Sequence, residues 1–299
     1  MQAMILAAGL GTRLLPHSAV RPKPLFPILN KPLLPVLVAR LKNFGFDHII
    51  VNCHHLRSQI VEALSATEGV VVQEEEILLG TGGGMRKALR HMRDEPLLVV
   101  NGDIYHTVNL GEMYRDHCSN EPGITLAMHD YPRFNGVMVN QGRVVGFNNT
   151  QNGRQLAFTG LHVVDPVLLE NIELDRFSCI IDHYRKLLQA GLDIRCYRVD
   201  HCYWTDMGTV GDYLQLHHDL LTGKVDRWAE LGEVSHPYCI DGDAKLAERV
   251  AMSGWVSVGK AEILGDSLLE RVVVWDDVSI PAGIKLVDTI ISGDVAGEN

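Results

Sequence analysis

Apolar and polar positions follow two alternating patterns through the first two thirds of the chain. Short continuous apolar runs, which are bounded by polar residues and are typical of buried strands, occupy residues 4–8, 48–53, 70–73 and 96–101. Apolar residues at helical spacing occupy residues 33–44, 58–64 and 84–92, and in the last of these Met85, Leu89 and Met92 share one face. Strands that alternate with helices predict βαβ units, and therefore a mostly parallel sheet covered by helices.

The region after residue 120 has a different pattern. Four short apolar segments, separated by Asn, Gln and Gly, lie at residues 125–128, 136–139, 144–147 and 161–164. They predict an antiparallel insertion into the sheet. The next predicted elements are a helix over 180–190, a strand over 194–199 and a helix over 210–221. We therefore expect one α/β domain with a mixed sheet over residues 1–222.

The C-terminal part of the chain has a third pattern. Residues 223–250 are charged and irregular, and we interpret them as a linker. Aliphatic residues then recur at every sixth position, in the series Val272, Val278, Ile284 and Ile290 and the series Val274, Ile280 and Leu286. This repeat predicts a short left-handed parallel β-helix over 251–299, with a β-meander as the alternative. Stacked coils often mediate self-association, so a homo-oligomer is a candidate assembly.

Composition limits the classes of function. The chain has 299 residues, enough for a large and a smaller domain, and its net charge of −10 argues against nucleic acid as the main partner. Its six cysteines form no Cys-x-x-Cys pair and its 14 histidines no His-Glu-x-x-His pair, so we expect reduced thiols in a cytoplasmic protein. The N-terminus lacks a basic region and the apolar runs are short, so we expect no signal peptide and no membrane span.

The segment that follows the first strand carries the strongest chemical signal. Gly9-Leu10-Gly11-Thr12-Arg13 comes directly after the apolar run, and Pro22-Lys23-Pro24 comes ten residues later. Glycines allow a sharp turn and the close approach of a ligand, and successive free N–H groups can then bind an anion. Arg13 and Lys23 add positive charge, and the prolines stiffen the backbone at Lys23. This arrangement suits a triphosphate.

Two common phosphate-binding loops do not fit this segment. The dinucleotide fingerprint needs a third glycine, where this chain has Leu14, and an acidic residue about 20 residues later. The Walker pattern needs Gly-Lys followed by Ser or Thr, which is also absent from the segment. A nicotinamide-dependent dehydrogenase is therefore a weak alternative.

Residues 6–24 closely resemble the signature of the sugar-1-phosphate nucleotidyltransferases, in which L-A-[AG]-G-x-G-[TS]-R-[LM] is followed by P-K-P. The resemblance implies a Rossmann-like, GT-A-like mixed sheet with helices on both faces, and a short β-helix tail also recurs in several branches of this family. It implies transfer of a nucleotidyl group from an NTP to a sugar-1-phosphate, which yields an NDP-sugar and pyrophosphate. Because the attacking phosphate oxygen is already an anion, the protein needs basic side chains and Mg²⁺ to bring two anions together in line.

The resemblance assigns roles to the residues of this signature. Arg13 would hold the β- and γ-phosphates, and Lys23 would contact the transferring phosphoryl group. The alternative is that both are solvated surface residues. The other nucleotide-binding residues implied by the motif are Leu6, Ala7, Ala8, Gly9, Gly11 and Thr12.

Two aspartates match the metal ligands of the family. Asp103 ends the segment Asn101-Gly102-Asp103 after an apolar strand, and Asp206 lies in Trp204-Thr205-Asp206, which resembles the family's W-x-D segment. Mg²⁺ prefers oxygen ligands and often takes only one or two carboxylates besides phosphate oxygens. The alternatives are a turn or cap role for Asp103 and an N-cap role for Asp206 before a helix that starts near Thr209.

The resemblance places the nucleobase near residues 73–83. Either Gln73 or Glu75 would read the edge of the base. The spacing does not distinguish between these two residues. The loop residues Thr81, Gly82 and Gly83 would contact the base, and the two glycines would permit close approach of the backbone.

The predicted sugar site departs from the family pattern. Gly136 and the pair Thr159-Gly160 match the family's sugar-binding residues. Many members carry an E-K-P segment between them, whereas this chain has Gly146-Phe147-Asn148-Asn149, so the second lysine expected on the sugar phosphate is missing. We expect Asn148 to contact sugar hydroxyls instead.

The resemblance limits the choice of nucleotide but leaves more than one base open. Ala7-Ala8-Gly9 is similar to uridylyltransferases, and the tail is similar to that of mannose-1-phosphate guanylyltransferases, so uridylyl or guanylyl transfer to a hexose-1-phosphate is predicted. One alternative is a cytidylyltransferase that acts on choline phosphate. Another is a catalytically inactive regulatory subunit, which would lack at least one of the four residues Arg13, Lys23, Asp103 and Asp206. All four are present.

Overall fold

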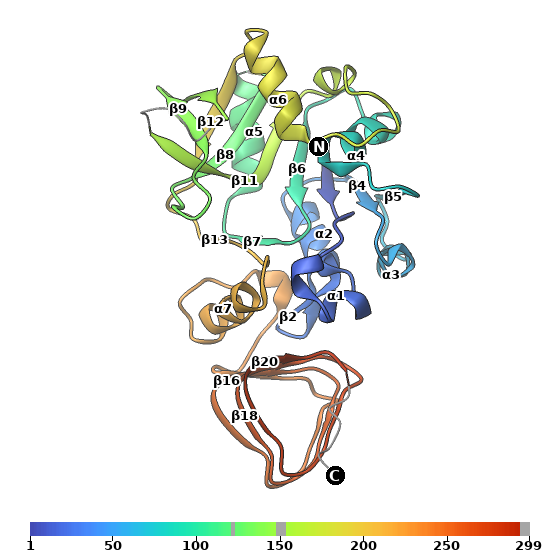
Figure 1. Ribbon diagram of the computed structural model, residues 1–299, viewed down its shortest axis with the longest axis vertical. Helices are drawn as coiled ribbons and strands as arrows, with labels where there is room; N and C mark the ends of the chain where they lie inside the picture. The colour runs from blue at the N-terminus through green and yellow to red at the C-terminus, as the bar shows by residue number, and fades with distance from the viewer. Residues whose placement is uncertain (121–122, 148–153, 294–299) are drawn as a thin grey trace. The chain divides into compact units, whose positions relative to one another are not determined.

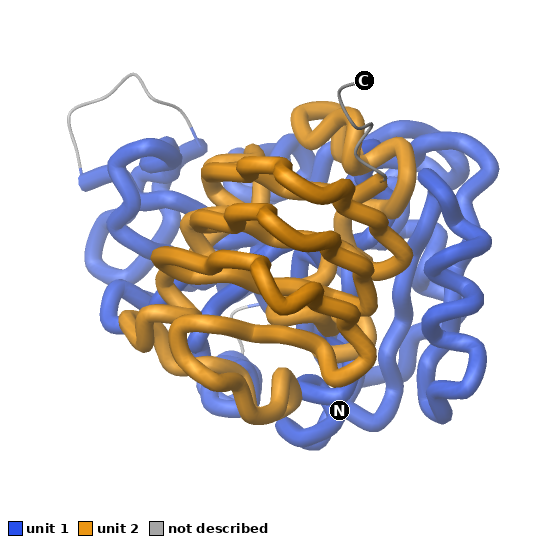
Figure 2. The backbone as a smooth tube through the Cα atoms, turned by 90° about the horizontal axis from the view of Figure 1, so that it is seen from below, with its two compact units in different colours: residues 1–10, 37–204 blue, residues 11–36, 205–299 orange. Residues whose placement is uncertain are grey.

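The computed structural model describes residues 1–120, 123–147 and 154–293, and the chain divides into two compact units (Figures 1 and 2). Unit 1 comprises residues 1–10 and 37–204, and unit 2 comprises residues 11–36 and 205–299. The division differs from the predicted boundary at residue 222. The segment 11–36, which carries most of the signature, belongs to the same unit as the C-terminal tail.

Unit 1 contains a nine-stranded sheet in the order β5-β4-β1-β6-β11-β8-β12-β10-β9. Its first four strands run parallel to one another and are β1 (Gln2–Leu6), β4 (His48–Cys53), β5 (Val70–Glu74) and β6 (Leu97–Asn101). The sequence predicts all four within two residues. Most aliphatic side chains of β1, β4 and β6 are buried, as expected for a parallel sheet covered by helices, whereas the valines of the edge strand β5 are partly buried.

The other half of the sheet is mixed. Its strands are β8 (Ile124–His129), β9 (Val137–Asn140), β10 (Arg143–Gly146), β11 (Gln155–Val164) and β12 (Ile194–Arg198). β11 runs antiparallel to β6, β8 and β9, and β10 runs antiparallel to β9, which confirms the antiparallel insertion. β12, however, pairs in parallel with β8. The short strand predicted at 161–164 is the end of the longer β11.

Helices connect these strands. They are α2 (Leu33–Asn43), α3 (Arg57–Leu64), α4 (Gly80–Ala88), α5 (Leu110–Asn120) and α6 (Ile180–Gln189). α4 packs against β1, β4 and α6. It begins four residues before the predicted start. Three of these four residues are glycines, which have a low helix propensity, so the sequence pattern does not signal this first turn. Met85 is buried in the core cluster, with Leu89 and Met92 packed against it, as the spacing predicts.

Several further elements between residues 12 and 206 are short. They are β7 (Ile104–His106), β13 (Trp204–Asp206), the 3-10 turns η1 (Thr12–Leu14) and η2 (Lys23–Leu25), α1 (His17–Val20), β2 (Pro27–Ile28) and β3 (Lys31–Pro32). α7 spans Val210–Leu221, as predicted, and Thr209 is its N-cap, since its Oγ1 accepts from the backbone N–H of Asp212 at 3.1 Å.

The tail of unit 2 consists of stacked parallel strands, visible in Figure 2. One sheet contains β14 (Tyr238–Ile240), β16 (Ala251–Val258), β18 (Leu268–Val274) and β20 (Lys285–Ile291). The other contains β15 (Lys245–Leu246), β17 (Glu262–Ile263) and β19 (Ser279–Ile280). β14 and β15 lie in the range expected as a linker, so the stack begins at Tyr238, earlier than residue 251. α7 packs against β16, β18 and β20.

Candidate functional site

The carboxyl end of β1 in unit 1 is joined to both neighbouring strands. The backbone N–H of Ala7 donates to Asn52 Oδ1 on β4 at 2.9 Å, and the N–H of Gly102 after β6 donates to Leu6 O at 2.9 Å. Ala7 and Ala8 are buried, whereas Gly9 is exposed and has open space where a Cβ would lie. The predicted nucleotide-binding residues of unit 1 therefore lie at the sheet edge where ligands of such folds bind.

Asn52 and Glu75 form a buried polar group beneath this strand end. Asn52 Nδ2 donates to Glu75 Oε1 at 2.8 Å, and Gln73 Nε2 donates to Gly84 O at 3.0 Å and to Glu75 Oε1 at 3.4 Å. Gln73 and Glu75 are each 1% exposed. Sequence reasoning missed Asn52, although its signal is a polar residue within an apolar strand. The network shows that Glu75 has a structural contact, while base recognition by Gln73 or Glu75 remains a prediction.

The N-terminal turn of α4 packs against the loop before α6. Thr81 Oγ1 accepts from the N–H of Ile180 at 2.9 Å, and the N–H of Gly82 donates to Ser178 O at 2.8 Å. A Cβ on Gly83 would overlap the carbonyl oxygen of Arg176. The close approach of this loop gives Gly82 and Gly83 a packing reason to be glycine. Their contact with a base, and that of Thr81, remain predictions.

Gly160, one of the predicted sugar residues, lies beside the segment that carries Asp103. Gly160 on β11 has φ +79°, and a Cβ there would overlap Nδ2 of Asn101 on the neighbouring β6. Thr159 Oγ1 donates to Ala127 O at 2.9 Å. Gly136, the first residue before β9, donates its N–H to Leu156 O on β11 at 3.1 Å. Asn148 lies outside the described residues.

Three aromatic rings, which sequence reasoning missed as a group, lie next to Thr159. The Tyr131 and Phe134 rings stack with their centroids 5.6 Å apart, and both meet the edge of the Trp204 ring. Trp204 Nε1 donates to Thr159 O at 2.9 Å. The cluster thus fixes the Trp of the W-x-D segment to the strand that carries Thr159-Gly160. Only the Trp had a signal in the sequence.

The remaining signature residues come together in unit 2. Gly11 has φ +65°, and its Cβ position lies 3.6 Å from the Cβ of Lys23, so the glycine loop packs directly on the Pro-Lys-Pro segment. Lys23 is 6% exposed, whereas Thr12 and Arg13 are exposed. The alternative of a solvated surface pair is therefore wrong for Lys23. A buried ammonium is costly unless it interacts with polar or charged groups, which is expected of a group built to meet an anion.

Arg13 and Asp206 share one space in unit 2. A Cβ on Gly208 would lie 2.7 Å from Asp206 Oδ2 and 3.0 Å from Arg13 Nη1, so both charged groups occupy the space left by the missing side chain. Because Thr209 is the N-cap of α7, the N-cap alternative for Asp206 is wrong. The carboxylate is partly exposed.

The two predicted metal ligands are carboxylates, which are the kind of ligand that Mg²⁺ takes. Among the described residues, no group of three or more His, Cys, Asp or Glu side chains is placed to hold a metal. Asp103 and Asp206 are both partly exposed carboxylates, one in each unit. Mg²⁺ commonly takes one or two carboxylates and completes its ligands with substrate phosphate oxygens and water. The two residues fit that chemistry.

Burial is the largest influence on the pKa of several other titratable groups. Burial lowers the pKa of His106 and His162 to about 3, which keeps both imidazoles neutral. Burial raises the pKa of Cys53 and Cys239 to about 11. All six cysteines are free thiols. These groups are poorly suited to act as bases or nucleophiles at neutral pH.

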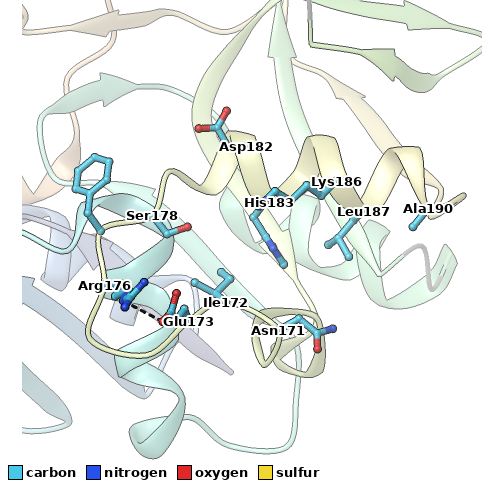
Figure 3. Close-up of a pocket in the computed structure, with 11 residues that line it drawn as sticks. Asn171, Ile172, Glu173, Arg176, Ser178, Asp182, His183, Lys186, Leu187 and Ala190 are labelled. Carbon is cyan, nitrogen blue, oxygen red and sulfur yellow. Dashed lines mark ion pairs between the residues drawn. The ribbon is translucent and has the colours of Figure 1, made fainter.

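A pocket of about 630 Å³ lies in unit 1 next to the loop that packs on α4 (Figure 3). Its walls come from residues 171–190, including His183 and Lys186 of α6, and Arg176 pairs with Glu173 at its rim at 2.9 Å. None of the predicted site residues lines it. Its link to the candidate site is Ser178, whose carbonyl accepts from Gly82.

A sequence model described as "Nucleotidyl transferase" matches residues 2–223, and the chain belongs to this family. No helix in the described part of the chain is long and apolar enough to cross a membrane. The family match therefore identifies the chain as a nucleotidyltransferase, which confirms the class implied by the resemblance.

Individual relatives share this assignment. The mannose-1-phosphate guanylyltransferase of Mycobacterium tuberculosis is 29% identical over 303 residues, which cover 95% of this chain and 82% of that protein. The N-acetylmuramate alpha-1-phosphate uridylyltransferase of Neisseria meningitidis is 30% identical over 222 residues, which cover 70% of this chain and 94% of that protein. The crystal structure of HddC from Yersinia pseudotuberculosis matches with a TM-score of 0.59 at 23% identity, over 72% of this chain and 97% of that one, and supports the fold.

Proposed function

We propose that this protein transfers a nucleotidyl group from an NTP to a sugar-1-phosphate and releases pyrophosphate. The observation that carries the proposal is the arrangement in unit 2, where Gly11 packs on Lys23 and Arg13 shares a space with Asp206. Gly11, two cationic side chains and a carboxylate thus belong to one compact unit, which supports a role for them in binding phosphate. The family match and the named activities of the relatives support the same reaction.

The chemistry follows from the charges. A phosphate oxygen of the sugar-1-phosphate attacks the α-phosphorus of the NTP, the bond to the β-phosphate bridging oxygen breaks, and pyrophosphate leaves. No protein base is required, because the nucleophile is already ionised. Lys23 would neutralise charge on the transferring phosphoryl group, and its burial strengthens that interaction by lowering the local dielectric. Arg13 would hold the leaving phosphates.

We propose Mg²⁺ as the cofactor, with Asp103 and Asp206 as its protein ligands. When bound, Mg²⁺ supplies additional positive charge to the phosphate oxygens. The partial exposure of both carboxylates leaves them accessible to an ion.

The finer features are proposed on the same basis. Guanylyl or uridylyl transfer to a hexose-1-phosphate is supported by the names of the relatives, which include both base types. Gly136, Thr159-Gly160 and Asn148 are the proposed sugar contacts. Free thiols throughout the chain support a reducing, cytoplasmic compartment.

We propose that the tail is a short left-handed parallel β-helix. Tyr238 pairs in parallel with Val256, Val256 with Val272, and Val272 with Thr289, so each strand returns after 16 to 18 residues, close to three six-residue faces. Val272, Val274, Val278, Ile280 and Ile290 of the predicted series are buried. A stack of this kind also supports a homo-oligomer.

A matrix of four NTPs and several sugar-1-phosphates, read by pyrophosphate release with Mg²⁺ and with EDTA, tests the proposal. GTP or UTP with a hexose-1-phosphate should give the highest rate, and EDTA should abolish it. Release with CTP and choline phosphate alone would favour the cytidylyltransferase alternative. No release with any pair would favour an inactive subunit of the same fold.

A further inference from the structure

The segment that carries Lys23 packs against the C-terminal tail within unit 2. Trp275, directly after β18, is 1% exposed and lies at the centre of this contact. The Arg21 guanidinium lies 4.9 Å from the centroid of the Trp275 ring. The Phe26 and Trp275 rings are in an edge-to-face arrangement, with their centroids 4.7 Å apart. Arg21 and Phe26 stand on either side of Pro22-Lys23-Pro24-Leu25, so one tail residue contacts the chain before and after Lys23.

A second contact fixes the hairpin that follows. Leu29 and Asn30 have φ of +50° and +65° and form the turn between β2 and β3. Asn30 Nδ2 donates to Val258 O at 2.7 Å and to Cys239 O at 3.1 Å, and Asn30 Oδ1 accepts from Ser257 Oγ at 2.8 Å. A single side chain thus hydrogen-bonds to both tail strands, β14 and β16.

α7 adds a third connection between the same two segments. The Tyr213 hydroxyl donates to Pro27 O and accepts from Trp275 Nε1 at 3.3 Å. At the start of the segment, His17 Nδ1 lies 2.6 Å from Ser292 Oγ. Residues 17–30 are therefore held at several points along their length by a tail that begins after residue 223, where the family match ends.

We propose that Trp275 and Asn30 are positioning residues for nucleotidyl transfer, which act by holding the Lys23 segment in place. The inference rests on the proposed function of Lys23. Transfer depends on charged groups held close to their productive positions, and a displacement of about 1 Å can cost about 100-fold in rate. The sequence suggested only self-association as a role for the tail. In this proposal the tail also contributes to the reaction.

Kinetics of matched variants test this role. Trp275→Leu removes the ring that faces Arg21 and Phe26, and Ile280→Ala removes a fully buried tail side chain from β19, in the other parallel sheet. Both should lower thermal stability. Only Trp275→Leu should lower kcat for pyrophosphate release, by about tenfold, with the KM for the NTP changed less than about threefold. Trp275→Phe, which keeps an aromatic face, should recover most of kcat.

Asn30→Gly provides an independent test if Trp275→Leu does not fold. Glycine adopts the left-handed turn without strain, so this variant removes the hydrogen bonds of the Asn30 side chain and keeps the hairpin. Amide hydrogen exchange of residues 17–30 should be faster in Asn30→Gly and Trp275→Leu than in Ile280→Ala, and kcat should fall in parallel.

Two results would overturn the inference. One is a kcat for Trp275→Leu or Asn30→Gly equal to that of Ile280→Ala, and the other is unchanged exchange over residues 17–30. If the wild-type protein releases no pyrophosphate with any substrate pair, the proposed function fails by itself. The exchange comparison then still decides whether Trp275 and Asn30 hold the segment.

Discussion

The side-chain amide of Asn52 joins the buried carboxylate of Glu75 to the end of β1. Asn52 Nδ2 donates to Glu75 Oε1 at 2.8 Å, and Asn52 Oδ1 accepts the backbone N–H of Ala7 at 2.9 Å. The position of Ala7, a predicted nucleotide-binding residue, therefore depends on a carboxylate that makes its own contacts inside the protein.

Replacing Glu75 with Ala should lower the free energy of unfolding by about 1–3 kcal/mol, because the buried Asn52 amide loses its acceptor. Glu76→Ala is the matched control, since the neighbouring carboxylate is exposed, and it should change the value by less than about 0.5 kcal/mol. Urea denaturation followed by fluorescence measures both variants. Equal losses would contradict the structural role of Glu75.

Lys23→Met should lower kcat for pyrophosphate release by about 100- to 1000-fold, because a buried cation that meets transition-state charge is removed. The KM for the NTP should change by less than about tenfold, since Arg13 remains. Lys31→Met is the control, because Lys31 is an exposed lysine of the same segment. A kcat for Lys23→Met within twofold of the wild type would exclude Lys23 from the reaction.

Gly208→Ala should lower turnover by at least about tenfold without unfolding the protein, because its Cβ would displace Asp206 Oδ2 and Arg13 Nη1 from their shared space. Gly211→Ala in α7 is the matched control, since the nearest atom to its Cβ lies at 3.7 Å, an ordinary contact. Steady-state kinetics and thermal melting of both variants provide the comparison. Full activity of Gly208→Ala would show that the spacing of Arg13 and Asp206 does not matter.

Asp103→Asn and Asp206→Asn should each raise the Mg²⁺ concentration needed for half-maximal activity by at least about tenfold, because a neutral amide is a weaker ligand than a carboxylate. Titration of pyrophosphate release with MgCl₂ measures this requirement, and thermal melting checks folding. Asp94→Asn, at an exposed position, serves as the control. An unchanged Mg²⁺ requirement in either variant would remove that residue from the metal site.

His162 should make the protein less stable in acid. Burial lowers its pKa to about 3, below the ordinary value of 6.5, so the unfolded chain takes up a proton first as the pH falls. Stability should therefore be lost from about pH 6.5 downward, at up to about 1.4 kcal/mol per pH unit for this group.

His162→Phe tests this dependence, because it keeps an aromatic ring against Phe158 and Tyr184 and removes the titrating group. Unfolding free energies measured between pH 5 and 6 should fall less steeply in the variant. Between pH 7.5 and 8.5 the two proteins should show the same slope. Parallel curves throughout would contradict the effect.

Local patterns predicted most of the elements, although the helix α5 was missed, and long-range pairing accounts for the differences within the sheet. The apolar runs of β1, β4, β5 and β6 and the helix α7 carry their signals in consecutive residues. The direction of β12 and the extent of β11 depend on partners far along the chain, which no local pattern specifies.

The residues of the candidate site also divide into those with a local sequence motif and those placed by long-range contacts. Arg13, Lys23, Asp103 and Asp206 were recognisable because their motifs are contiguous in sequence. Asn52 bonds to Ala7, 45 residues away, and Trp275 contacts Phe26 from the other end of the chain. Both lie in segments that read as ordinary strand and repeat positions. Their contribution depends on tertiary packing, so only the structure shows it.

The tail returns to the same face after every 16 to 18 residues. A domain built in equal turns can gain or lose a whole turn during evolution with little disturbance to the turns that remain. The turn that carries Trp275 is constrained in a different way, because Arg21 and Phe26 rest on it. Insertions and deletions should therefore accumulate beyond this turn, while the number of residues between α7 and Trp275 stays nearly constant among proteins that share the contact.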